Sequence, residues 1–306
     1  MREIPHQQRE YAIVLFYRYV DIEDPRALAH DVRTHARRSH LTGRAIIASE
    51  GINATFEGRT AELHAFCEWL TEDSRFAGID LKFSPGTGAA FPKLSVKVRP
   101  EIVASHLPAE VHPTRDTGTH ITPEELRSWY ERGEEFVVID MRNSYEYQAG
   151  HFRGSIDPGM ENFRDLPKVL PKLEHLKHTK VVPVCTGGVR CEKASAYLKQ
   201  QGFSDVYQLE GGIHRYLEAY PGEAFEGELY VFDQRKLWSP TPRASTKQVG
   251  TCSVCSGATN NIENCRFDDC PKQLCVCEEC RTIAPVRAHF CSDACHTHAH
   301  ASPIAA

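Results

Sequence analysis

Short apolar runs alternate with amphipathic stretches along the first hundred residues. Glu50-Gly51 separates two β-rich runs and predicts a hairpin, and Asp24 and Pro25 form a typical helix start. The expected elements are, in order, a strand at 11–20, a helix at 25–40, a hairpin at 44–56, a helix at 60–70 and strands at 81–83 and 94–98. The order βαββαβ predicts a ferredoxin-like α+β domain over residues 1–105.

The periodicity fades over residues 106–121, which we expect to be a linker, and a second unit begins at the helix-capping sequence Thr122-Pro123-Glu124-Glu125. Its expected elements are strands at 136–140, 181–185 and 206–209 and helices at 191–201 and 213–219. This alternation predicts an α/β domain with a parallel sheet over residues 122–232. A proline- and serine-containing segment then leads into a cysteine-rich tail at residues 233–306.

The stretch with the clearest chemistry is Cys185-Thr186-Gly187-Gly188-Val189-Arg190, which lies between a buried strand and a helix. A glycine-containing loop at a helix N-terminus turns its N–H groups inward and favours an anion. These dipoles and the charge of Arg190 should lower the pKa of Cys185 and stabilise a thiolate or persulfide. The competing interpretation is a buried structural cysteine beside a phosphate-type loop.

Cys191 directly follows the loop and has two interpretations. It is a candidate resolving thiol for an oxidised or persulfidated Cys185. Its spacing with Ala194, Ser195 and Leu198 favours instead a small apolar residue on the buried face of the helix. Upstream of the loop, we expect scaffold roles for the polar residues Asp140, Arg142, Glu146 and His151.

Charge and hydropathy narrow the class of protein. The chain has 36 basic and 41 acidic residues, a net charge of −5, so bulk electrostatics cannot hold it on nucleic acid. Its apolar runs are too short for a membrane helix and its first residues lack a signal sequence, which predicts a cytoplasmic protein. Two local basic patches are candidate RNA contacts or ordinary solvated helix faces: residues 162–193, with net charge +4, and a cluster near residues 33–44. The candidate RNA contacts are Arg33, Arg37, Arg38, Arg44 and Lys193.

Nine of the twelve cysteines crowd into the tail. Eight of them form four short-spaced pairs, which are Cys252 and Cys255, Cys265 and Cys270, Cys277 and Cys280, and Cys291 and Cys295. Such pairs are typical zinc ligands, and eight thiolates suffice for two structural zinc ions, in an interleaved arrangement or in sequence. Cys275 is left over, and His289 is an alternative ligand. Disulfides or free thiols are the competing interpretation.

A cysteine followed by four residues and an arginine resembles the active-site loop of rhodaneses. The segments at residues 43–55, 185–194 and 209–213 are further similar to the tRNA uridine hydroxylases. That resemblance implies an acylphosphatase-like domain, a rhodanese domain and a cysteine-rich tail. It also implies oxygen-dependent conversion of the tRNA wobble uridine to 5-hydroxyuridine, with Cys185 as the catalytic cysteine through a persulfide.

Two other functions stay open at this point. A sulfurtransferase, which takes sulfane sulfur from a donor and passes it to an acceptor, needs the same stabilised sulfur. A rhodanese fold can also act only as an interaction module. The sequence has no His-x-Asp or His-x-Glu pair for an iron site and no Gly-x-Gly-x-x-Gly fingerprint for a flavin or nicotinamide.

Overall fold

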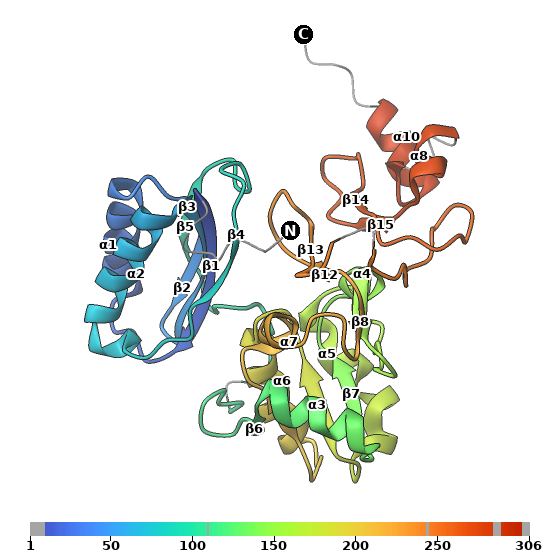
Figure 1. Ribbon diagram of the computed structural model, residues 1–306, viewed down its shortest axis with the longest axis horizontal. Coiled ribbons are helices and arrows are strands. Elements are labelled where there is room, and N and C mark those ends of the chain that lie inside the picture. The colour runs from blue at the N-terminus through green and yellow to red at the C-terminus, as the bar shows by residue number, and fades with distance from the viewer. Residues whose placement is uncertain (1–9, 109, 243–244, 284–288, 302–306) are drawn as a thin grey trace.

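The computed structural model of the chain describes residues 10–108, 110–242, 245–283 and 289–301. It divides into three parts along the sequence, seen from blue to red in Figure 1: an N-terminal domain, a central domain and a C-terminal region. Among the described residues, no helix combines the length and apolarity that crossing a bilayer requires.

The N-terminal domain contains all the elements that the sequence predicts, and its two closing strands extend the βαββαβ order by one strand. Its sheet has the order β4-β1-β3-β2-β5, in which β5 lies parallel to β2 and the other pairs are antiparallel. Helices α1 and α2 cover one face, on the side away from the rest of the chain (Figure 1). The elements are β1 (Tyr11–Tyr19), α1 (Pro25–Arg38), β2 (Thr42–Ala48), β3 (Gly51–Arg59), α2 (Thr60–Glu72), η2 (Ser74–Phe76), β4 (Lys82–Pro85) and β5 (Leu94–Val98).

The two faces of this sheet differ because side chains alternate along a strand. Val14 and Phe16 of β1 lie in the core beneath the helices. Leu15 and Tyr17 project from the opposite face, together with Arg44 of β2. The helix-free face therefore carries the side chains that meet the central domain.

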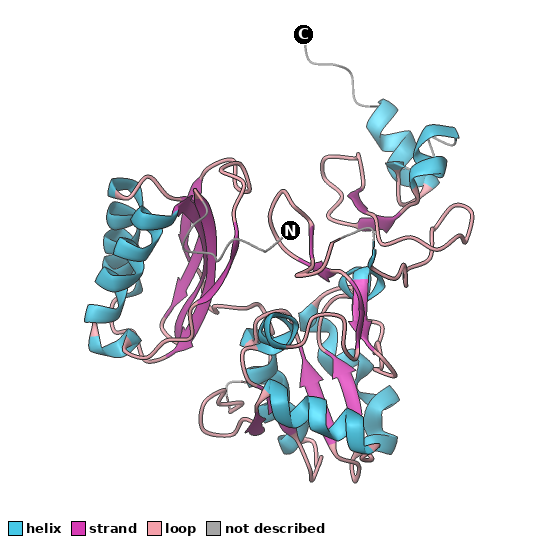
Figure 2. Ribbon diagram, viewed as in Figure 1, coloured by secondary structure: helices cyan, strands magenta, loops and turns pink. Residues whose placement is uncertain are grey.

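The central domain is built on parallel strand pairs, β7 with β9 and β10 with β6, joined by a parallel bridge between Val181 and Val206. Val182 packs with helices α3 and α7 on one face, and Val181 packs with α5, η4 and α6 on the other. Figure 2 shows helices on both faces of these strands. The elements are β6 (Thr119–Ile121), α3 (Pro123–Arg132), β7 (Val137–Asp140), α4 (Ser144–Ala149), β8 (Gly150–Phe152), η3 (Phe163–Asp165), α5 (Leu166–Val169), η4 (Leu170–Leu176), β9 (Val181–Val184), α6 (Val189–Gln200), β10 (Tyr207–Leu209) and α7 (Gly212–Ala219).

The C-terminal end of the predicted linker is a strand in the structure. Strand β6 falls inside residues 106–121 and pairs with β10, so the central sheet begins before residue 122. Three residues are too few to show strand periodicity, which is why the sequence pattern missed this strand. The capping box that was predicted at the next helix is present, since Thr122 and Glu125 cap each other's backbone.

The C-terminal region contains short hairpins and helices. Ile262 and Cys275, paired across β14 and β15, pack together with Tyr230 against Ala149 of α4, so this region docks on the central domain. Its elements are β11 (Phe225–Gly227), β12 (Leu229–Tyr230), β13 (Leu237–Trp238), β14 (Ile262–Asn264), β15 (Gln273–Cys275), α8 (Glu278–Ile283) and α10 (Asp293–Ala301).

Candidate active site and metal centres

Cys185 lies directly after β9, and α6 begins four residues later at Val189. The loop between them curls around the sulfur, and the N–H of Gly188 donates a hydrogen bond of 3.2 Å to Cys185 Sγ. Gly188 has a φ of +104°, a conformation that favours glycine and that aims this N–H at the sulfur. The structure therefore has the inward-turned loop that the sequence predicts.

The surroundings of Cys185 favour its ionised form. Complete burial raises the pKa of the thiol, but hydrogen bonds from the thiol and backbone N–H of Cys191, the charge of Arg190 and the N–H of Arg190 outweigh it and lower the pKa to about 6. Burial and the neighbouring sulfur raise the pKa of Cys191. The proton of this pair therefore stays on Cys191, which acts as a donor to the Cys185 thiolate.

Arg190 is itself held by a buried partner. Its guanidinium forms a two-pronged ion pair with Glu146, with N–O distances of 2.7 and 2.9 Å, and also donates to Thr186 Oγ1 at 3.4 Å. Glu146 lies in the first turn of α4 and is completely buried. Glu146 therefore has the expected scaffold role, because its ion pair fixes the position of the arginine that faces the sulfur.

The other expected scaffold residues also have structural partners. Asp140 and Arg142 form a buried ion pair of 2.6 Å, and Arg142 also donates to the carbonyl of Gly150. His151 stacks on the ring of Tyr147 and contacts its carbonyl through Nδ1 at 2.9 Å. These contacts explain why the side chains are present without a direct role in the reaction.

Helix α7 supports the loop by donating hydrogen bonds to the carbonyl groups of the loop. The N–H groups of Ile213 and His214 donate to the carbonyls of Cys185 and Thr186 at 3.0 and 2.9 Å. Gly212 has a φ of +66°, and a Cβ there would lie 2.6 Å from the Cys185 carbonyl oxygen. The glycine at the start of α7, which carries part of the family resemblance, therefore allows close packing that keeps the loop carbonyls turned away from the sulfur.

The N-terminal domain closes the other side of the loop, a contact that sequence reasoning missed. A Cβ on Gly187 would lie 2.9 Å from Leu15, and one on Gly188 would lie 2.7 Å from the hydroxyl of Tyr17. The Tyr19 hydroxyl donates to the carbonyl of Val189 at 3.1 Å. The available signal was the row of large side chains at alternate positions of β1, on the face that the helices leave open.

A cavity of about 350 Å³ lies between the two domains, with Cys185 in its wall. Cys185 has no exposed surface, so its sulfur is sheltered from bulk solvent. The N-terminal sheet contributes Leu15, Tyr17, Arg44, Ile46, Asn53 and Thr55, and the other parts of the chain contribute Asn143, Arg164, Arg190 and Phe232, among others. This volume is in the range of small-molecule and nucleotide pockets.

The predicted basic cluster does not come together at this cavity. Only Arg44 borders it, because Arg33, Arg37 and Arg38 lie on α1, which packs on the other face of the sheet. Lys193 is also not available to RNA, since it is buried and pairs with Glu50 at 2.9 Å and Glu101 at 3.5 Å. The helical spacing of basic residues could not reveal which of them face the cavity.

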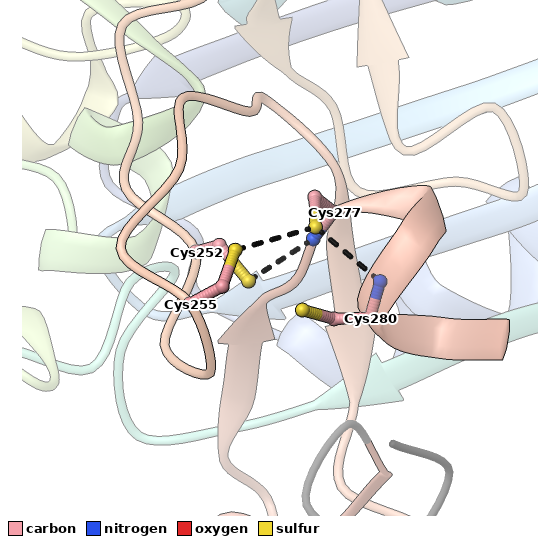
Figure 3. A group of neighbouring side chains, drawn as sticks. All are labelled: Cys252, Cys255, Cys277 and Cys280. Atoms are coloured by element: carbon pink, nitrogen blue, oxygen red, sulfur yellow. Dashed lines mark hydrogen bonds between the residues drawn. The ribbon is translucent and has the colours of Figure 1, made fainter. Parts of the chain in front are cut away.

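The tail cysteines converge into two groups of four, in each of which the sulfur atoms lie within 4.8 Å of one another. Each group could hold one metal ion. The first joins the loop at residues 252–255 with the start of α8, and its side chains point toward one another in Figure 3. It consists of Cys252, Cys255, Cys277 and Cys280. The second consists of Cys265, Cys270, Cys291 and Cys295.

The two groups interleave along the sequence: the first and third cysteine pairs form one group, and the second and fourth pairs form the other group. The disulfide interpretation is wrong for this structure: the Cys291–Cys295 and Cys255–Cys277 sulfur distances are 3.4 and 3.7 Å, against about 2.05 Å for a disulfide. Cys275 stands outside both groups, with its thiol directed at the Thr259 carbonyl. His289 belongs to neither group.

Comparisons with known proteins cover nearly the whole chain. The family models that match are a UPF0176 acylphosphatase-like domain at residues 11–102, a rhodanese-like domain at 122–219 and a rhodanese C-terminal region at 226–296. A tRNA uridine(34) hydroxylase of Cytophaga hutchinsonii is 40% identical over 96% of this chain and 93% of its own. One of Kocuria rhizophila is 41% identical over 88% of this chain and 93% of its own.

Solved structures match single domains. A rhodanese-like domain from Anabaena sp. is 25% identical and covers 36% of this chain and 80% of its own, with a TM-score of 0.31. An acylphosphatase from Coxiella burnetii is 18% identical and covers 31% of this chain and all of its own, with a TM-score of 0.24.

Proposed function

Because the chain belongs to the tRNA uridine(34) hydroxylase family, we propose that it converts the wobble uridine of tRNA to 5-hydroxyuridine at the cavity beside Cys185. Membership makes it a tRNA-modifying oxidoreductase on a rhodanese domain. Molecular oxygen is the proposed co-substrate, and the cytoplasm is the proposed location of an enzyme that acts on tRNA. The observation that carries the proposal for the site is the low-pKa sulfur in the wall of the cavity.

The thiolate of Cys185 is the proposed reactive group. With a pKa of about 6, this thiol is mostly ionised at neutral pH. The thiolate attacks the outer sulfur of a sulfane donor such as thiosulfate. An S–S bond forms on Sγ while the S–S bond of the donor breaks, and sulfite leaves with the electron pair. The Gly188 N–H and Arg190 then face the negative charge of the resulting persulfide.

Cys191 serves in this proposal as the hydrogen-bond donor to that sulfur. It is almost completely buried on the inner face of α6, which supports the structural interpretation. Its retained proton stabilises the Cys185 thiolate, so the residue acts through Cys185 and is a positioning residue.

Each cysteine group of the tail binds one structural Zn²⁺ in this proposal. Tetrahedral Zn–S bonds of about 2.3 Å place the sulfur atoms about 3.8 Å apart, close to the 3.4–3.7 Å between neighbouring sulfurs here. Backbone N–H groups donate to Cys252 Sγ and Cys277 Sγ, both at 3.4 Å, and such bonds stabilise thiolates. The metal would tie the tail together where apolar side chains are few.

The proposed function is tested in cells that lack the endogenous activity. We expect the intact protein to add one oxygen to a wobble uridine, measured by mass spectrometry of tRNA nucleosides. Cys185→Ala should abolish the product. Cys67→Ala, which changes a cysteine in the N-terminal core, should retain it. A gain of sulfur would instead establish a sulfurtransferase. If the intact protein leaves the nucleosides unchanged, a non-catalytic interaction module is the remaining interpretation.

A further inference from the structure

Phe232 is an unusual residue to find at the cavity. It follows β12, lines the cavity, and is one of three large apolar side chains in the described residues that are clearly exposed, at 39%. Tyr230 supports it edge-on at 5.2 Å. An exposed aromatic ring beside a reactive group offers a flat surface on which a nucleobase can stack.

Two guanidinium groups flank this ring. The Cζ atoms of Arg44 and Arg190 lie 5.2 and 5.8 Å from its centroid. Arg190 is neutralised by Glu146 and also contacts Thr186, as described above. Arg44 has neither an ion-pair nor a hydrogen-bond partner in the part of the chain that the structure describes, so its guanidinium N–H groups are available to a ligand.

A second available charge comes from the opposite wall. Seven basic residues lie between residues 162 and 193, and six have ion-pair or hydrogen-bond partners. Arg164, which is exposed and lines the cavity, has none among the described residues. Among the described residues, the cavity therefore has one arginine without an ion-pair or hydrogen-bond partner from the N-terminal sheet and another from the central domain, with an aromatic ring also in its wall.

We propose that Phe232 stacks on the wobble uracil after it turns out of the anticodon loop, and that Arg44 and Arg164 bind phosphates of the RNA beside it. Base edges in a loop become accessible when the base leaves the stack. Arginine pairs with phosphate through two parallel hydrogen bonds. The inference rests on the proposed function, since it takes tRNA as the substrate and names the residues that recognise one nucleotide of it.

The test uses the full chain with Cys185→Ala, which binds without turnover, and a synthetic anticodon stem-loop with uridine at the wobble position. A matched stem-loop lacks the base at that position. We expect Phe232→Leu to weaken binding of the uridine stem-loop by about 5- to 150-fold, the range for loss of one base stack. The same change should leave binding of the abasic stem-loop unaltered. Phe232→Trp, which keeps an aromatic surface, should retain the preference for uridine.

Arg44→Gln and Arg164→Gln should weaken binding of both stem-loops alike. Each should also reduce the slope of log affinity against log salt by about 0.7, the value for one phosphate contact on a single strand. Arg37→Gln, an exposed arginine on α1, is the matched control and should change neither quantity. Fluorescence anisotropy at several salt concentrations measures all of these affinities.

Three results would overturn the inference. They are equal weakening of both stem-loops by Phe232→Leu, loss of the uridine preference in Phe232→Trp, and an effect of Arg37→Gln as large as that of the cavity arginines. A separate nucleoside assay, with Cys185 unchanged, distinguishes failure of the recognition site from failure of the proposed reaction. If the protein hydroxylates tRNA but the variants bind the two stem-loops as the unmodified cavity does, only the recognition site is refuted. If the variants show the expected affinities but no hydroxylation occurs, only the reaction is refuted.

Discussion

The hydroxyl of Tyr17, on strand β1, donates a hydrogen bond of 3.0 Å to the carboxylate of Glu192, on helix α6. The same carboxylate oxygen lies 3.6 Å from His120 Nε2 on β6, and this contact raises the pKa of His120. Two residues that are 175 positions apart in the sequence thus connect the N-terminal domain to the helix that begins in the Cys185 loop.

Loss of the Tyr17 hydroxyl should weaken the docking of the two domains. We expect Tyr17→Phe to lower the free energy of unfolding by about 1–2 kcal/mol, because Glu192 loses a hydrogen-bond donor in a partly buried place. Urea denaturation measures the change. Tyr11→Phe is the control on the same strand, since the Tyr11 hydroxyl has no hydrogen-bond partner among the described residues. Equal losses in the two variants would contradict this role.

The pKa of Cys185 should depend on the proton held by Cys191. Site-resolved alkylation of Cys185 should accelerate with pH around a midpoint near pH 6 in the unmodified protein. Cys191→Ala removes the donor and should move the midpoint upward, whereas Cys191→Ser keeps a donor and should move it less. A midpoint that is the same in all three proteins would exclude Cys191 as a stabiliser of the thiolate.

The buried pair of Arg190 and Glu146 should be sensitive to loss of one charge. Glu146→Gln leaves the Arg190 guanidinium buried without its counter-ion and should destabilise the fold by about 3 kcal/mol or more. Glu161→Gln breaks an exposed pair with Lys272 and should cost less than about 1 kcal/mol. Thermal and urea unfolding of both variants would show the difference, and similar losses would argue against a buried pair.

Gly212 should be irreplaceable for steric reasons rather than only conformational ones. An added Cβ would meet the carbonyl oxygen of Cys185 at 2.6 Å, so Gly212→Ala should displace the loop and reduce hydroxylation severely. Gly202 has a φ of +91° but open space around it, and Gly202→Ala should cost only about 1 kcal/mol of stability while activity is retained. Full activity in Gly212→Ala would refute the role of this contact.

The purified protein should contain two zinc ions per chain, as measured by elemental analysis. Cys255→Ser and Cys270→Ser should each remove one ion, because they change different groups, and Cys275→Ser should remove none. Strong chelators should increase hydrogen exchange in the tail, since thiolate–zinc bonds are its main cross-links in this proposal. Loss of both ions from either single variant would mean that the two sites do not bind independently.

The sequence alone determined the features that depend on residues close together in the chain. Strand and helix periodicity predicted the α+β domain and the α/β domain, and the spacing of Cys185, its glycines and Arg190 predicted a loop that stabilises anionic sulfur. The four cysteine pairs are equally local, because two thiols a few residues apart can bend toward one point.

The tertiary structure decided what depends on packing between distant segments. It partitioned the cysteine pairs into interleaved groups, buried Lys193 between two glutamates and placed Arg44, Arg164 and Phe232 around one cavity. Charge and hydrophobicity of a residue do not specify which partner will cover it, since that depends on how whole sheets and helices dock. Local patterns therefore identified the reactive sulfur, whereas only the docked domains revealed the walls around it.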